Sequence, residues 1–241
     1  MPVLRVIGPG RAGSSFAAAL AAAGWQVLQP VRRGDDPAGA AAGADLLVVA
    51  TPDAAVAGVA ASVEPVERTV VLHLSGSLTL DALAPHARRA SVHPLRSIPT
   101  PDTPLAGAWF AVAGDPMAAT LVDAMGGRKV AVDDADRVAY HAAACIASNH
   151  LVALLGQVER VAASAGVPFE AYVELVRQTV DNVARLGPAA ALTGPVRRGD
   201  LETVARHLAA IHPGERPAYE AMAAAASKLV PVPTPDQRGG S

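Results

Sequence analysis

A glycine-rich segment near the start of the chain has the residue types and the spacing needed to hold a dinucleotide. The pattern G-x-G-x-x-G follows the apolar run at residues 3–7 directly and is formed by Gly8, Pro9, Gly10, Arg11, Ala12 and Gly13. The first glycine permits a tight turn, the second leaves room for a pyrophosphate, and the third allows close packing of helix on strand. The free N–H groups at the start of the next helix would then face the phosphates. The alternative is a glycine-rich turn that binds nothing.

The residues that choose between the two nicotinamide dinucleotides are expected about 20 positions further on, at the end of the second strand. An enzyme that uses NAD has an acidic residue there, whereas this chain has Arg32 and Arg33. Guanidinium groups suit the 2′-phosphate of NADP, so we expect NADP(H) rather than NAD as the cofactor. The alternative is that both arginines are solvated and that Asp35 or Asp36 binds the ribose.

A polar stripe on a long apolar helix provides candidate catalytic groups. His141, Cys145 and Asn149 follow one another at four-residue spacing and therefore share one face of the helix. We interpret this stripe as a cleft wall, on which His141 donates a proton to a carbonyl oxygen as hydride reaches the carbon, and Asn149 orients the substrate. Cys145 lacks the setting of a nucleophile and is expected to be a small buried residue. The alternative is a core histidine and an amide without a catalytic role.

Polar residues also follow two of the expected inner strands, at the edge where a doubly wound sheet binds its ligands. Thr51 and Pro52 follow the third strand and are assigned to the cofactor, while the next residue is expected to cap a helix. The fourth strand is followed by small residues that can bind a substrate carboxylate or the nicotinamide amide, namely Ser75, Gly76 and Ser77. A plain helix cap is an equal alternative for this second segment.

Two further groups complete the candidate substrate site. His93 follows the fifth strand, although a structural histidine before a proline-rich turn is at least as good an explanation. Arg197 and Arg198 lie between two glycines just before a helix that Asp200 caps, and they are candidates to clamp an anionic substrate. A solvated loop between helices is the alternative. No spacing of cysteine and histidine residues suggests a metal site.

Short apolar runs and alanine-rich helical stretches alternate through the first half of the chain. The runs lack polar alternation, which is typical of buried parallel strands, and the helical stretches between them imply crossover connections. Strands are expected at residues 3–7, 26–31, 45–50, 69–74 and 90–93, and, after a proline-rich loop, at 109–113 and 129–132. The pattern predicts the α/β class with a doubly wound parallel sheet, the Rossmann fold.

From residue 133 onward the sequence predicts helices only. The first runs from a cap at Asp133 to about Ser164, and the others are expected around 169–186, 200–211 and 217–229. We therefore expect a dinucleotide-binding domain at 1–132, a helical substrate and dimerisation domain at 133–230, and a disordered tail at 231–241.

The composition limits the compartment and the partners. Half of the residues are hydrophobic (51%) and the formal net charge is −2, which gives no reason to expect nucleic acid or an anionic membrane as a partner. The single cysteine, Cys145, excludes a disulfide within the chain and fits a reducing compartment. No signal-peptide pattern is found, and no apolar run approaches the roughly 20 residues that span a bilayer. We expect a cytoplasmic protein.

The order of these features resembles the superfamily of ketopantoate reductase, pyrroline-5-carboxylate reductase and 6-phosphogluconate dehydrogenase. The resemblance covers nearly the whole chain and rests on the glycine loop, the strand end at residues 50–53, the segment at 75–77 and the long helix. The most similar branch consists of Rossmann-like oxidoreductases with a C-terminal domain of unknown function, whose pattern is echoed at residues 93–95 and 193–200. The resemblance implies an NADP(H)-dependent oxidoreductase that forms a homodimer through its helical domain.

The chain departs from that superfamily on the long helix. Ketopantoate reductases are similar in presenting a lysine and two asparagines at four-residue intervals, and these positions fall on His141, Cys145 and Asn149, of which only the last matches. His141 then replaces the lysine as the acid, or the substrate differs, or catalysis has been lost. The resemblance implies reduction of a small carboxylate-bearing carbonyl or imine, with ketopantoate as a candidate. The alternatives are a non-catalytic NADP(H)-binding regulator or sensor and a deazaflavin-dependent reductase.

Overall fold

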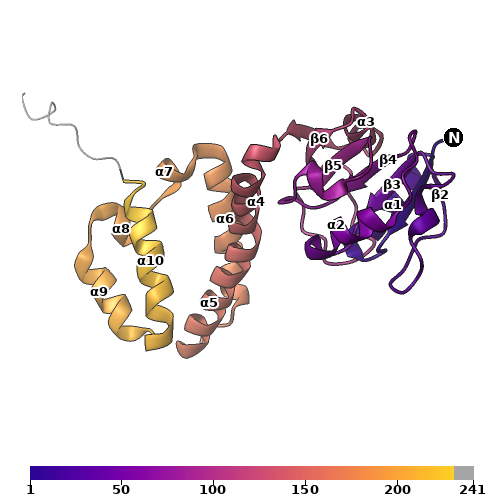
Figure 1. The fold of residues 1–241 in the computed structure, drawn as a ribbon. Coiled ribbons are helices and arrows are strands. Elements are labelled where there is room, and N and C mark those ends of the chain that lie inside the picture. The colour runs from indigo at the N-terminus through magenta and orange to yellow at the C-terminus, as the bar shows by residue number, and fades with distance from the viewer. Residues whose placement is uncertain (231–241) are drawn as a thin grey trace, which may run out of the picture. The chain divides into compact units, whose positions relative to one another are not determined.

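The chain divides into two compact units, Met1–Ser148 and Asn149–Ser241, and each is described by itself. The structure is a computed structural model that describes residues 1–230 (Figure 1). The predicted disordered tail at 231–241 lies outside the described residues. The last strand ends close to the predicted domain boundary at residue 132, yet the helix that follows it belongs to the first unit.

The first unit is built on a seven-stranded sheet of order β2-β1-β3-β4-β5-β6-β7. Its strands are β1 (Val3–Ile7), β2 (Gln26–Val27), β3 (Leu46–Val49), β4 (Val70–His73), β5 (Arg89–Pro94), β6 (Trp109–Gly114) and β7 (Arg128–Ala131). The Rossmann-like α/β class is thus confirmed. One pair, β5 with β6, is antiparallel, which corrects the expectation of a wholly parallel sheet. Residues 95–108 contain no helix that could return the chain to the far edge, so the strand that follows runs back antiparallel.

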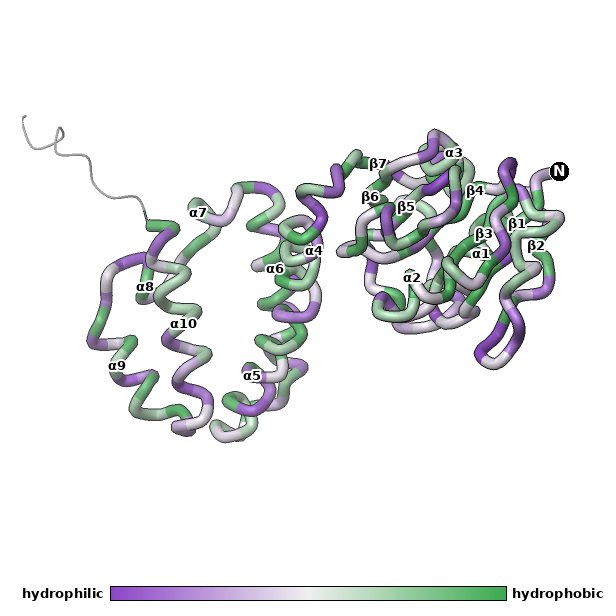
Figure 2. The backbone as a smooth tube through the Cα atoms, viewed as in Figure 1, coloured by the Kyte–Doolittle hydropathy of each residue, from purple (hydrophilic) through white to green (hydrophobic). Residues whose placement is uncertain are grey.

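Helices cover both faces of this sheet because the strand side chains alternate between two cores. Phe16 and Leu20 of α1 (Arg11–Ala22) pack with Leu72 in the first core, beside α3 (Met117–Ala124). Val56 of α2 (Asp53–Ser62) packs with Val71 in the second. Two short 3₁₀ turns, η1 (Ala38–Ala41) and η2 (Leu80–Leu83), close the loops on the second side. Hydrophobic residues follow the inner strands in Figure 2. The carboxyl ends of β1, β3, β4 and β5 therefore meet at one edge.

A long helical run follows the sheet, as the sequence predicts. It comprises the 3₁₀ turn η3 (Asp134–Asp136), α4 (Arg137–Cys145), a π-helical turn (Ile146–His150) and α5 (Leu151–Ser164). The run has 31 residues and contains an 18-residue window of mean hydropathy 1.4, so by length and composition it could cross a membrane. This corrects the expectation that no apolar run is long enough. A single helix of this kind is weak evidence, because core helices of water-soluble proteins pass the same test.

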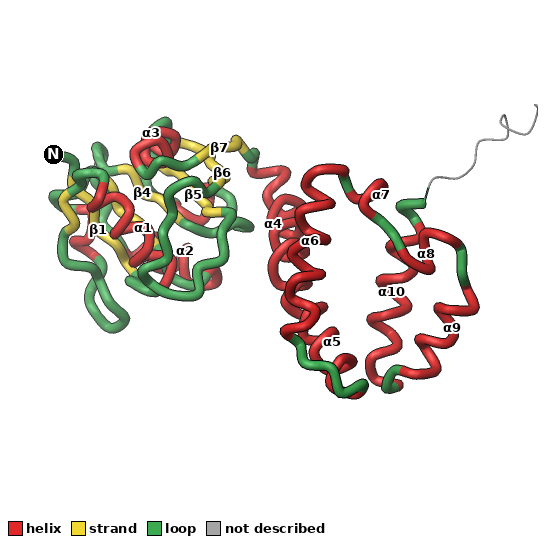
Figure 3. Tube along the Cα trace, turned by 180° about the vertical axis from the view of Figure 1, so that it is seen from behind, coloured by secondary structure: helices red, strands yellow, loops and turns green. Residues whose placement is uncertain are grey.

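The described part of the second unit consists of helices and the loops that connect them, without a strand, as Figure 3 shows. After α5 come α6 (Glu170–Leu186), α7 (Pro188–Ala191), α8 (Gly194–Arg198), α9 (Leu201–Ala210), the 3₁₀ turn η5 (Pro213–Glu215) and α10 (Arg216–Ser227). The short helix α8 corrects the expectation of a loop around residues 193–199: Pro195 occupies its first turn and Gly199, at φ +69°, ends it. Asp200 caps α9 as predicted, since its carboxylate accepts the N–H of Thr203 at 3.0 Å.

Candidate functional site

The glycine loop between β1 and α1 has the shape that its sequence predicts. Gly8 has a φ of +83°, and a Cβ on Gly13 would lie 2.6 Å from the carbonyl oxygen of Gly8, so both positions exclude side chains. Gly10 differs, because a Cβ there would meet no atom within 4 Å. No side chain within residues 1–230 caps the start of α1. The loop thus offers open space beside uncapped N–H groups, an arrangement that fits a pyrophosphate.

The turn after β2 presents its two arginines to solvent. The loop is tied to the glycine segment, because the N–H of Gly8 donates to the carbonyl oxygen of Val31 at 3.0 Å. Asp35 is used within the turn, where its carboxylate accepts the N–H of Arg32 at 2.7 Å. Arg32 and Arg33 are exposed, and their guanidinium groups form no ion pair with any described residue. This geometry favours the arginines over Asp35 as the group that faces a ribose phosphate.

The strand end after β3 lies against the glycine loop. A Cβ on Gly8 would be 3.1 Å from Cγ2 of Thr51, and the hydroxyl of Thr51 is buried without a partner among the described residues. Pro52 immediately precedes α2, and Asp53 lies in its first turn. A buried hydroxyl without a partner at a ligand edge is a candidate for a contact with a bound molecule.

The serines after β4 are hydrogen-bonded to Asp53 of this neighbouring helix. The carboxylate of Asp53 accepts both hydroxyl protons, from Ser75 at 2.7 Å and from Ser77 at 2.9 Å. The hydroxyl oxygen of Ser75 also accepts the N–H groups of Ser77 and Leu78. Ser75 therefore holds the turn together, and its assignment as a substrate contact stays a prediction.

Two histidines that are 48 positions apart in the sequence meet over Gly76. A Cβ on Gly76 would lie 2.7 Å from Cδ2 of His141 and 2.9 Å from Cε1 of His93, so only glycine fits between them. The two imidazole rings are edge to face, with centroids 5.9 Å apart. Tyr140 completes the group, with its hydroxyl 2.7 Å from Nδ1 of His93. We call these four residues the Gly76 cluster; the sequence singled out all of them except Tyr140.

Burial keeps the hydrogen-bonded pair of this cluster uncharged at neutral pH. Burial lowers the pKa of His93 to about 4, with the neighbouring His141 and Arg137 acting in the same direction and Asp53 in the opposite one. It raises the pKa of Tyr140 to about 12, with Arg137 acting in the opposite direction. His93 is thus a neutral imidazole at pH 7.

Beneath the cluster lie polar residues that the sequence did not single out. His73, at the end of β4, is fully buried, and burial followed by the charge of Arg137 lowers its pKa to about 4. Arg137 begins α4 and is also fully buried. Its Nε donates to Asp134 at 3.0 Å, and the other carboxylate oxygen of Asp134 accepts the N–H of Leu80 at 3.2 Å. Arg137 lies three residues before Tyr140 and four before His141, and this helical spacing is the sequence signal that could have identified it.

The remaining predicted site residues, Asn149, Arg197 and Arg198, belong to the second unit. The stripe holds as far as Cys145, whose Sγ lies 4.0 Å from Nε2 of His141. The π-helical turn at Ile146–His150 then changes the helical period, so four-residue spacing no longer defines the face of Asn149. Arg197 and Arg198 lie in the last turn of α8, and both are exposed. Their predicted contacts with substrate stay predictions.

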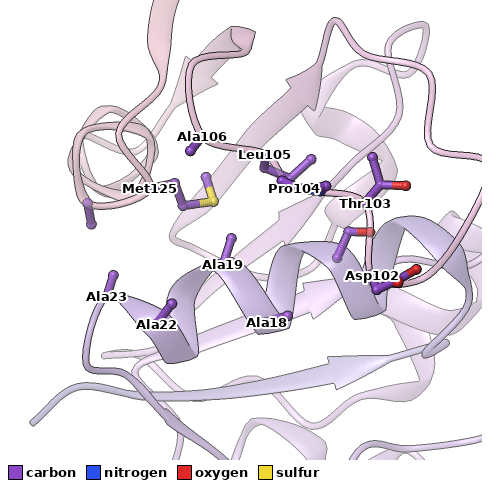
Figure 4. A pocket seen from close by; sticks show the side chains of 12 residues that line it. Ala18, Ala19, Ala22, Ala23, Asp102, Thr103, Pro104, Leu105, Ala106 and Met125 are labelled. Atoms are coloured by element: carbon purple, nitrogen blue, oxygen red, sulfur yellow. The ribbon is translucent and has the colours of Figure 1, made fainter.

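A separate hollow lies on the outer side of α1 (Figure 4). It has a volume of about 360 Å³ and is lined by Ala18, Ala19 and Ala22 of α1, by residues 102–106 and by Met125. None of the predicted site residues lines it. Half of its lining residues are alanines, and Asp102 is the only titratable side chain among the residues that line it.

Comparison with known proteins agrees with this fold. Residues 110–226 match a family described as a domain of unknown function, DUF2520. No curated protein matches the chain. A Bacteroides fragilis protein provisionally named an NADP oxidoreductase has a similar structure, with a TM-score of 0.77 and 18% identity, over 94% of this chain and 98% of that one.

Two further solved structures are similar over almost their whole length. The reductive aminase from Aspergillus terreus, in complex with NADPH and ethyl levulinate, has a TM-score of 0.67 and 20% identity, with 95% of this chain and 92% of that one covered. Pyrroline carboxylate reductase from Plasmodium falciparum, with NADP bound, has a TM-score of 0.61 and 13% identity, with coverage of 95% and 98%. These likenesses confirm the predicted fold, a Rossmann-like domain followed by helices.

Proposed function

We propose that this protein is an NADP(H)-dependent oxidoreductase that reduces a small carbonyl or imine substrate bearing a carboxylate. One observation carries the proposal: the glycine loop and the Gly76 cluster lie at the same edge of one sheet, where the strands β1, β3, β4 and β5 end. In a doubly wound sheet this edge holds the dinucleotide and the reacting groups together. The structural neighbours that bind NADPH or NADP support the choice of cofactor.

The first unit supplies the cofactor contacts of the proposal. Gly8, Gly10 and Gly13 shape the loop, the N–H groups at the start of α1 face the pyrophosphate, and Arg32 with Arg33 pairs with the 2′-phosphate. When bound, NADPH supplies the hydride. Thr51, with its buried free hydroxyl, adds a hydrogen bond beside the loop.

We assign protonation of the substrate to His141. Its ring is only partly buried, and it stands against Gly76 beside a neutral His93. A ring nitrogen of His141 donates its proton to the substrate oxygen or nitrogen, which gains electron density as the carbon is reduced. His93, fixed by Tyr140, bounds the substrate on the other side. We assign orientation of the substrate to Asn149, and recognition of its carboxylate to Arg197 or Arg198, as the sequence suggests.

The protein is further proposed to act as a cytoplasmic homodimer. Large apolar residues are exposed on α5 and α6, including Val152, Leu175, Val180 and Leu186. A second copy of the chain would cover such a surface. The free thiol of Cys145 fits a reducing compartment.

The first test measures binding of NADPH, NADH and reduced deazaflavin by calorimetry. We expect NADPH-selective binding that weakens by about tenfold or more in the Arg32→Ala/Arg33→Ala double variant, because two charge-assisted bonds to the 2′-phosphate are lost. Arg177→Ala, on the exposed surface of α6, is the matched control and should bind as the wild type does. Absence of nucleotide binding would remove the proposal, and preference for deazaflavin would replace its cofactor.

The second test assigns the proton donor. In a screen of 2-oxo acids and cyclic imines that includes ketopantoate, His141→Asn should lower kcat by roughly 10²–10⁴-fold and leave the affinity for NADPH nearly unchanged. His150→Asn, an exposed histidine of the π-helical turn, is the control. An unchanged rate in His141→Asn would exclude His141 as the donor. NADPH binding without turnover of any substrate would favour a sensor.

A further inference from the structure

The hydroxyl of Tyr140, in the Gly76 cluster, makes one hydrogen bond within residues 1–230, and its partner is His93. The hydroxyl oxygen lies 2.7 Å from Nδ1 of His93, and the two rings are edge to face with centroids 5.6 Å apart. Both groups are uncharged at neutral pH, because burial lowers the pKa of His93 to about 4 and raises the pKa of Tyr140 to about 12. The bond therefore joins a neutral phenol to a neutral imidazole, and either group has a hydrogen to donate.

The direction of this bond follows from the hydrogens that the two groups carry. A neutral imidazole has one N–H, and the hydrogen bond made by one ring nitrogen decides which nitrogen holds it. If Nδ1 donated to Tyr140, the phenol O–H would have no acceptor among residues 1–230, although the residue is partly buried. If the O–H of Tyr140 donates to Nδ1, both groups are satisfied. Phenol is also a stronger acid than neutral imidazole, which makes it the stronger donor.

Nε2 then carries the hydrogen of His93, and it is the ring atom that a ligand can reach. The edge formed by Nδ1 and Cε1 is covered, since a Cβ on Gly76 would lie 3.0 Å from the first atom and 2.9 Å from the second. Nε2 has no hydrogen-bond partner within residues 1–230, and the ring as a whole is partly exposed. His93 lies near the carboxyl end of β5, at the edge where a sheet of this class binds its ligands.

We infer that Tyr140 is a positioning residue that holds His93 in the Nε2–H tautomer, and that this N–H donates a hydrogen bond to the substrate atom that His141 protonates. Neutral imidazole keeps its N–H at pH 7, so His93 polarises that atom without giving up a proton. A donor that is already fixed in direction stabilises the electron density that the atom gains during reduction. The role toward the substrate rests on the proposed function, whereas the tautomer does not.

Two donors at one atom favour a carbonyl substrate. The rings of His93 and His141 both lie against Gly76 with their centroids 5.9 Å apart, close enough for one N–H of each to reach a single atom. A carbonyl oxygen has two lone pairs and can accept both bonds. An imine nitrogen has one lone pair and can accept only one. Of the two substrate classes proposed above, the pair of histidines thus fits carbonyl compounds, and among these a 2-oxo acid also carries the carboxylate.

The tautomer can be measured by NMR on the full-length protein with ¹⁵N-labelled histidine at pH 7. Correlations between the ring nitrogens and the carbon-bound ring hydrogens identify the protonated nitrogen, and His93→Gln assigns the resonances of His93. In the wild type we expect a protonated Nε2 and an accepting Nδ1. Tyr140→Phe should move both nitrogens toward the average of the two tautomers, because the hydrogen bond that selects one of them is lost. Tyr140→Leu replaces this variant if it does not fold.

A second pair of tyrosine and histidine provides the matched control. The hydroxyl of Tyr219 lies 2.7 Å from Nδ1 of His207, and these rings are edge to face with centroids 5.9 Å apart. Tyr219→Phe should change the resonances of His207 and leave those of His93 as in the wild type. A wild-type His93 that is protonated at Nδ1 overturns the inference, and so do His93 nitrogens that are unchanged in folded Tyr140→Phe. If neither variant at position 140 folds, the wild-type spectrum decides alone.

Turnover tests the part of the inference that concerns the substrate. In the screen of 2-oxo acids and cyclic imines, His93→Leu should lower kcat for the 2-oxo acid by roughly 10²–10³-fold and leave the affinity for NADPH nearly unchanged. His93→Gln should restore part of that loss, since its amide N–H can take the place of Nε2–H. Faster turnover of cyclic imines than of 2-oxo acids would overturn the substrate class. Failure of NADPH binding with the expected tautomer would remove only the proposed function, whereas the opposite tautomer in an active enzyme would remove only this inference.

Discussion

The two units of this chain bury their apolar side chains to different extents. The strands of the first unit carry side chains such as Leu46, Leu72 and Phe110 that are fully buried between two helical layers. In the second unit, α6 is a strongly amphipathic helix of 17 residues, none of which is buried, and Val180 is 52% exposed. The first unit thus contains a complete hydrophobic core, whereas the second leaves large apolar side chains exposed. Both tryptophans, Trp25 and Trp109, belong to the first unit, so their fluorescence reports on it alone.

Acid should destabilise the first unit more than the second, because the two buried histidines with lowered pKa values lie in the first unit. The pKa values of His73 and His93 are lowered from 6.5 to about 4, and unfolding restores the ordinary value. Between pH 6.5 and 4 the unfolded state binds more protons, so the free energy of unfolding falls as the pH falls and is constant above that window. The loss is on the order of 3 kcal/mol for each histidine.

Urea unfolding followed by tryptophan fluorescence at pH 7, 5.5 and 4.5 measures this loss. His73→Gln should halve the fall in the free energy of unfolding between pH 7 and 4.5, because one of the two titrating groups is gone. His207→Gln, in the second unit, is the control and should leave it unchanged. A free energy of unfolding that is independent of pH in this window contradicts the assignment of neutral, buried rings.

A pair of truncations compares the two kinds of packing directly. Leu72→Ala should lower the free energy of unfolding of the first unit by about 2–5 kcal/mol, because it leaves a cavity in a closed core. Val180→Ala should cost less than about 0.5 kcal/mol at protein concentrations low enough to keep the chain monomeric, since its side chain is half exposed. Equal costs for the two variants, measured by urea unfolding with circular dichroism, would mean that the second unit has a core of its own.

The smallest effect on folding, and the clearest on assembly, is expected from a charge on α6. Val180→Asp should abolish the proposed homodimer and leave the tryptophan fluorescence of the first unit as in the wild type, because the substituted residue is exposed in the single chain. Sedimentation velocity over a hundredfold range of concentration measures the association. Glu174→Asp, on the same helix, is a conservative control. A wild-type chain that is monomeric throughout would exclude the second copy as the partner of this surface.

The fold could be predicted because local residue patterns determine most of it. The apolar runs of β1, β3 and β4, and the glycines that a tight turn requires, are features that each segment carries by itself. The direction of β6 was not predictable in that way. An apolar run such as residues 109–113 has the same pattern in either direction, and only the connection through residues 95–108 sets it.

The site was predictable residue by residue and not as an assembly. His93 and His141 were found from their places at a strand end and on a helix, while their meeting over Gly76 depends on the packing of α4 against the sheet. Tyr140 was missed because its partner lies 47 residues away, and nothing near it in the sequence marks the hydrogen bond. Asn149 was placed by assuming one uniform helix, and the π-helical turn is a departure that no simple periodic pattern reveals.

The tight contact at Gly76 has a consequence for how related sequences can diverge. Any side chain at this position would overlap both His93 and His141, so it can be accepted only if both rings are replaced by smaller side chains or displaced. Substitutions at positions 76, 93 and 141 should therefore occur jointly across relatives. Glycine at position 76 with both histidines would then identify the lineages that retain this chemistry, and a larger residue there would identify those that have abandoned it.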